Sequence, residues 1–78
     1  MKDKLHKLVL SIVEKEDSVE ISETAENGIV NLVIKVDPAD MGKIIGKGGK
    51  VIKGLRNVMK IIAMKRNEKV FVNLEESV

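Results

Sequence analysis

The chain has 78 residues, of which 44% are hydrophobic and 33% charged, and its net charge is +2 at pH 7. This composition is typical of one small globular domain and excludes a disordered segment. A chain of this size buries only about 60% of its unfolded surface, which leaves little room for a deep enzymatic cleft. The absence of cysteine excludes disulfides and cysteine zinc sites and fits a reducing compartment. The apolar run at residues 8–13 is too short for a membrane span and lacks the features of a signal peptide.

The first predicted element is an amphipathic helix over residues 2–15. Leu5, Leu8, Val9 and Ile12 recur at helical spacing, with charged residues between them. One face of this helix is therefore expected to pack against a core.

Two antiparallel strands are predicted next, at residues 19–25 and 29–36, because apolar and polar residues alternate in both. Asn27-Gly28 separates them, and this dipeptide between alternating segments is a strong signal for a two-residue hairpin turn. The alternation indicates a sheet with one covered face.

A short helix is predicted over residues 38–45. Asp37 is the expected N-cap, proline occupies the first helical position, and Asp40 places a negative charge in the first turn. Gly46 ends the helix, while Gly42 inside it costs about 1 kcal/mol relative to alanine. A weak helix beside a glycine-rich loop breaks local rules of folding, which favours a functional role for this region.

A second helix is predicted at residues 50–65, followed by a strand at residues 69–74 and a frayed tail at residues 75–78. The whole chain, residues 1–78, is thus expected to form a single α+β domain with helices on one face of a three-stranded mixed sheet. If the last two strands are neighbours, the helical crossover makes them parallel and right-handed. The core stripe of the second helix comprises Ile52, Leu55, Met59 and Ile62.

The segment between the two helices, Gly46-Lys47-Gly48-Gly49, combines little side-chain bulk with positive charge. It lies within residues 41–66, which carry eight Lys or Arg and no acid, whereas the other residues carry a net charge of −6. A glycine-rich loop lets backbone amides approach a ligand closely, and positive charge favours anions. This combination predicts a site for a polyanion such as a chain of phosphates.

Enzyme signatures are absent. A Walker loop requires glycine where Ile44 stands and Ser or Thr where Val51 stands, and a dinucleotide fingerprint also requires glycine at position 51. His6 is the only histidine and is expected at the surface. We therefore predict no catalytic residue, no metal site, no cofactor and no small-molecule substrate.

The segment Ile44–Ile52 resembles the aliphatic-Ile-Gly-x-x-Gly-x-x-Ile core of KH domains and matches it at every fixed position. The order of elements is similar to the type II, prokaryotic arrangement. The length and the lead-in at residues 37–43 resemble the small stand-alone bacterial KH proteins of the KhpA type. One departure is Gly48, where a polar or basic residue is common.

The resemblance implies non-catalytic binding of single-stranded RNA with low sequence specificity. It also implies cytoplasmic roles in RNA metabolism, including chaperone activity, and pairing with a second KH-containing protein. Bases are expected on an aliphatic groove floored by Ile34, Ile45 and Ile52, although core packing is the more common role of such residues. Stacking platforms are not expected with a single Phe. The expected RNA-binding residues are Lys43, Ile45, Gly46, Lys47, Gly48, Gly49, Lys50 and Lys53.

Two other functions stay open from the residues alone. One is a helix-turn-helix DNA-binding domain, although the second helix has a poor recognition sequence at residues 50–54. The other is a protein-interaction module. Gly54, Ile61 and Met64 lie away from the core stripe of the second helix, where polar residues are expected, and predict a homodimer interface.

Overall fold

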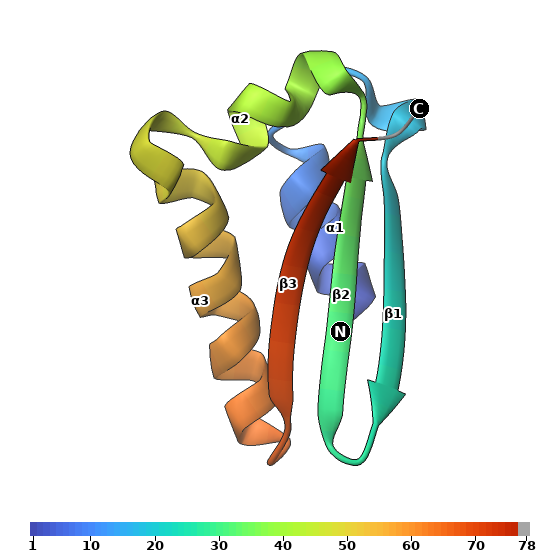
Figure 1. Ribbon diagram of the computed structural model, residues 1–78, viewed down its shortest axis with the longest axis vertical. Coiled ribbons are helices and arrows are strands. Elements are labelled where there is room, and N and C mark those ends of the chain that lie inside the picture. The colour runs from blue at the N-terminus through green and yellow to red at the C-terminus, as the bar shows by residue number, and fades with distance from the viewer. Residues whose placement is uncertain (77–78) are drawn as a thin grey trace.

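The computed structural model describes residues 1–76 as two layers (Figure 1). One layer is a three-stranded sheet, and the other contains three α-helices. In the view of Figure 1, α1 (Lys2–Leu10) lies behind the sheet, α2 (Met41–Ile45) lies at the top, and α3 (Lys50–Lys65) lies at the left. This is the predicted α+β arrangement.

The sheet has the order β1-β2-β3, with β1 at Glu20–Glu26, β2 at Ile29–Val36 and β3 at Lys69–Glu76. The β1–β2 pair is antiparallel and the β2–β3 pair is parallel, as predicted. Asn27 and Gly28 have φ of 53° and 75°, the left-handed values that a type I′ hairpin turn requires. The alternate residues of β2 face the helices and are nearly inaccessible; they are Val30, Leu32, Ile34 and Val36.

The first helix is shorter than predicted, because it ends at Leu10 and not at residue 15. The backbone N–H groups of Glu14 and Lys15 donate to the carboxylate of Asp40, at 3.2 Å and 3.0 Å, instead of continuing the helix. Val13 still reaches the core and is 8% exposed. Asp40 thus determines where the chain leaves α1, although the sequence suggested only a helix-dipole role for it.

The start of the short helix agrees with the prediction. The Asp37 carboxylate accepts a hydrogen bond of 2.9 Å from the Ala39 N–H, and a single 3₁₀ turn at Pro38–Asp40 leads into α2. Gly46 ends α2, with its N–H donating to the carbonyl of Gly42 at 2.9 Å. The capped start and glycine end together fix where the loop after α2 begins.

The predicted frayed tail is wrong for its first half. Glu75 and Glu76 belong to β3 and pair with Lys35 and Val36 of β2. Strand β2 is long enough to template these two residues. Residues 77–78 lie outside the described part of the chain.

We expect Asp40→Asn to lower the melting temperature, because the N–H groups of Glu14 and Lys15 donate to different carboxylate oxygens, and asparagine replaces one of these oxygens by an NH2 donor. The Lys15 N–H is the main cause that holds the pKa of Asp40 below its usual value of 3.8; burial opposes it, and the Glu14 N–H and the charge of Lys43 add to it. A lowered pKa contributes stability above pH 3.8 that is lost as the pH falls through the folded-state value. Thermal melts of both proteins between pH 2 and 7 check this. The difference in melting temperature between wild type and Asp40→Asn should become smaller in acid. A difference that does not change with pH would contradict the role of the Asp40 charge.

Candidate nucleic-acid interface

The loop between α2 and α3 depends on glycine at its first position. Gly46 has φ 74° and ψ 171°, a conformation that is essentially restricted to glycine. A Cβ at this position would also lie 2.3 Å from Cγ2 of Val51. Gly48 and Gly49 have positive φ as well, but a Cβ on either would meet open space. Gly46 is therefore required both by conformation and by its contact with the first turn of α3.

Two backbone donors of this loop are left for a ligand. The Gly49 N–H donates to the carbonyl of Gly46 at 3.1 Å, and the Lys50 N–H donates to that of Lys47. The hydrogen bonds within residues 1–76 assign no protein acceptor to the N–H groups of Lys47 and Gly48. Both donors lie just before the N-terminus of α3, where the helix dipole favours an anion.

The lysines around the loop differ in how available their charges are. Lys47, Lys50 and Lys53 are exposed, and none of the ion pairs found in the described part of the chain involves them. Lys43 instead pairs with Glu14 at 2.5 Å and lies 3.9 Å from Asp40. The Lys43 charge is thus partly compensated, so three of the four predicted lysines form the basic surface at the loop.

Core packing, which the sequence favoured over a base contact for the three isoleucines of the expected groove floor, is confirmed for two of them. Ile34 is fully buried in the central strand, and Ile52 is 8% exposed in the helical core. Their positions on β2 and α3 face the space between the layers, where burial outweighs any contact with a ligand. Ile45 is 40% exposed beside the loop and is the one of the three that a base can reach.

A groove that the sequence analysis missed lies between α3 and β3. It forms a cavity of about 240 Å³, and the Arg56 Nε donates to the carbonyl of Val72 at 3.1 Å across it. Arg56 and Lys60 follow Lys53 at spacings of three and four, which places the three cations on one side of α3. The spacing of these three cations in the sequence could have predicted the basic side of the groove. The lining residues are Arg56, Asn57, Lys60, Val70, Phe71, Val72 and Asn73.

The outer face of α3 exposes apolar side chains, as the sequence suggested. Ile61 is 56% exposed and Met64 is 65% exposed. A Cβ on Gly54 would meet nothing within 4 Å, so packing within the chain does not explain this glycine. The face is compatible with a contact to another molecule.

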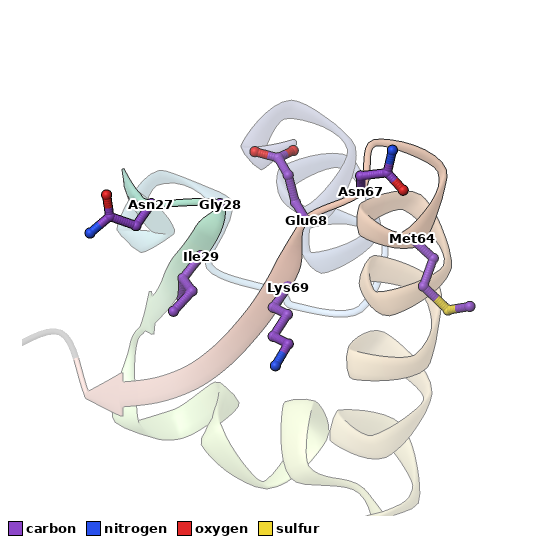
Figure 2. A pocket seen from close by; sticks show the side chains of 7 residues that line it. All are labelled: Asn27, Gly28, Ile29, Met64, Asn67, Glu68 and Lys69. Carbon is purple, nitrogen blue, oxygen red and sulfur yellow. The ribbon is translucent and has the colours of Figure 1, made fainter.

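A hollow of about 620 Å³ lies at the end of the sheet far from the glycine loop, between the hairpin turn and the start of β3 (Figure 2). Ile29 and Lys69 point to one side of the sheet, and Glu68 points to the other. These side chains do not converge on a common point, so the hollow does not form a small-molecule cleft. Within residues 1–76, no three His, Cys, Asp or Glu side chains come together as metal ligands do. None of the helices in this part of the chain has the length and hydropathy of a membrane span.

The chain matches a known protein family and several of its members. The family model described as "KhpA/KhpB, KH domain" matches residues 2–74. The chain is 40% identical over 74 residues to the RNA-binding protein KhpA of Clostridium acetobutylicum and 39% identical to that of Clostridium perfringens; each match covers 95% of this chain and 99% of the relative. It is 30% identical over 76 residues to the RNA-binding protein KhpA of Aquifex aeolicus, covering 97% of this chain and 96% of the relative.

Proposed function

Because the chain belongs to the KhpA/KhpB family of KH domains, we propose that it is a cytoplasmic, non-catalytic protein that binds single-stranded RNA as one KH domain spanning residues 1–78. The observation that carries this proposal is the loop at residues 46–49. Within residues 1–76, it presents two backbone donors without protein acceptors beside three lysines that form no ion pair. The relatives from the two Clostridium species are named RNA-binding protein KhpA, which supports the same assignment.

In this proposal the loop binds a phosphate of the RNA backbone. The N–H groups of Lys47 and Gly48 donate to its oxygens, and the dipole of α3 adds a favourable field. Lys47, Lys50 and Lys53 hold the flanking phosphates, and Ile45 offers an apolar surface for a base. Phosphate contacts carry no direct sequence information, so specificity is expected to be low.

The strand then follows the groove between α3 and β3. Arg56 and Lys60 continue the row of cations along α3, which gives phosphates a path away from the loop. A KH loop holds about four nucleotides of backbone, and reading bases requires them to be splayed out of a duplex. Single-stranded RNA is therefore the expected ligand in preference to duplex DNA.

Salt dependence tests this function and separates it from the alternatives. Three to four phosphate contacts predict a slope of roughly −2 to −3 in log affinity against log salt concentration, because each contact to a single strand contributes about −0.7. Fluorescence anisotropy of a labelled single-stranded RNA between 50 and 300 mM KCl measures the slope. A protein that prefers duplex DNA would contradict the proposal in favour of a helix-turn-helix function. Absence of binding to either nucleic acid would favour a protein-interaction module.

We also propose that the outer face of α3 joins two KH domains, either as a homodimer or with a second KH-containing protein. Gly54 leaves room for close approach of another helix, and Ile61 and Met64 supply exposed apolar area two or more turns further along. One KH domain holds few nucleotides, so two linked domains would bind a long RNA more tightly through effective concentration.

Ile61→Asp is accordingly expected to yield a folded monomer with weaker binding to long RNA. A carboxylate in an apolar contact would be desolvated without a partner, which opposes association. Sedimentation equilibrium of wild type and Ile61→Asp at high micromolar concentration checks the oligomeric state. Lys4→Asp changes the net charge by more, at an exposed position of α1 away from this face, and serves as the control. A monomeric wild type, or a dimeric Ile61→Asp, would contradict this interface.

A further inference from the structure

The single Phe of the chain lies on the uncovered face of the sheet. Residues of β3 alternate between the two faces, and Val72 is 4% exposed on the helical side whereas Phe71 is 54% exposed on the open side. Single exposed apolar residues are common on protein surfaces. What distinguishes Phe71 is the set of side chains around it.

Two amide side chains lie beside the aromatic ring. Asn31 is the direct register partner of Phe71 on β2, and Thr24 of β1 completes the same row. Asn73 follows two residues along β3 and therefore lies on the same face. Directly paired residues have Cβ atoms about 4.5–5.5 Å apart. The two Asn side chains thus provide hydrogen-bond donors and acceptors beside the ring.

Cations border the ring on the side of α3. Phe71 and Lys60 together line two adjoining cavities between α3 and β3. The hydrogen bond from Arg56 to Val72 holds a guanidinium at the edge of β3, next to Phe71 in the chain. Lys69 lies two residues before Phe71 on β3, and its side chain points to the open face of the sheet (Figure 2).

Carboxylates at both ends of the open face of the sheet restrict an anion to the middle of that face. Glu26 pairs with Ile29 at the hairpin end of the open face, and Glu20 and Glu75 flank Lys35 at the other end. Between them, the two rows that contain Asn31 and Asn73 have no acid. A phosphate backbone running along the sheet would meet negative charge at both ends, whereas one crossing β3 at Phe71 would meet only cations and neutral groups.

We propose that RNA held in the α3–β3 groove crosses the edge of β3 and stacks one base on Phe71, with Asn31 and Asn73 hydrogen-bonding the edge of that base. This inference rests on the proposed RNA-binding function and adds a stacking subsite outside the loop. The positive charge beside the ring and the continuity with the groove favour a nucleotide as occupant. A protein partner would be expected to cover a contiguous apolar patch. On this face the aliphatic neighbours of Phe71, Ile29 and Val33, are interrupted by Asn31, Asn73 and Lys69, which favours a nucleotide.

Comparing the binding of a short RNA with that of a long RNA distinguishes the contribution of this subsite from that of the loop. A CACA tetramer is long enough for the loop, and a ten-nucleotide (CA)₅ RNA can also reach the sheet. We expect Phe71→Ala to weaken binding of (CA)₅ by about 5- to 150-fold, which is the range measured for loss of one base–aromatic stack. Its affinity for CACA should equal that of wild type. Phe71→Trp should restore (CA)₅ binding, and its indole emission should be quenched by (CA)₅ and not by CACA.

Each outcome distinguishes between the two proposals. Equal (CA)₅ affinity of wild type and Phe71→Ala, or indole emission unaffected by (CA)₅, would overturn the stacking subsite while leaving the loop site in place. Failure of wild type to bind either RNA would overturn the RNA-binding function and the subsite with it. Phe71 is exposed, so the fold of all three proteins is expected to be the same, and far-ultraviolet circular dichroism checks this.

Discussion

Replacing Lys47 and Gly48 together by aspartate is expected to abolish RNA binding while leaving the fold intact. Both residues are exposed in the loop, and a Cβ on Gly48 would meet nothing within 4 Å. The φ of 65° at Gly48 is a left-handed value that Asp tolerates better than most residues. Two carboxylates beside the free amides would repel phosphate at the point where the account places it. Anisotropy titration with single-stranded RNA measures the loss, and a thermal melt checks the fold.

The matched control replaces the same two residues by neutral side chains of similar size, Lys47→Gln with Gly48→Asn. It keeps the backbone amides available and adds no negative charge, so binding should fall only by the contribution of one lysine. A folded double-aspartate protein that binds RNA like wild type would show that the loop is not the site.

Gly46→Ala is expected to have the largest effect on stability of any single glycine substitution in the loop. The added Cβ would be 2.3 Å from Val51 Cγ2 and 2.8 Å from the Val51 N, which is backbone and cannot rotate away. Strained backbone and overpacking each cost about 1–3 kcal/mol, which suggests a loss of about 2–6 kcal/mol in the free energy of unfolding. Native stabilities are only about 5–15 kcal/mol, so this loss is a large fraction. Urea denaturation measures it.

Gly42→Ala is the matched control, because it makes the same change four residues earlier. Gly42 lies inside α2, and its added Cβ would meet open space. Helix propensity then predicts a gain of up to about 1 kcal/mol. If Gly46→Ala were as stable as Gly42→Ala, this would contradict the claim that the loop packs too closely against α3 to admit a side chain at position 46.

Local sequence signals were enough for the elements around the site. Asn27-Gly28 gave the hairpin, the Asp37 cap gave the start of the short helix, and periodicity gave α3 with its ends. These features depend on neighbours in the chain, so local rules capture them. The glycine loop was found for the same reason, because its composition and charge are contiguous.

What the sequence missed depends on contacts between distant segments. Asp40 ends α1 by accepting hydrogen bonds from residues 25 and 26 positions earlier, which no local pattern encodes. The pairing of Lys43 with Glu14 is equally non-local. Alternation along the last strand placed Phe71 opposite Val72, but only the register of β3 against β2 identified Asn31 as its neighbour.

The most direct test of the account follows the backbone amides of ¹⁵N-labelled protein by NMR during titration with single-stranded RNA. The central claim is that the phosphate backbone binds the free N–H groups of the loop. The largest shifts are therefore predicted at Lys47 and Gly48, with smaller shifts through the first turn of α3. Shifts confined to the outer face of α3, around Ile61 and Met64, with unchanged loop amides, would contradict it.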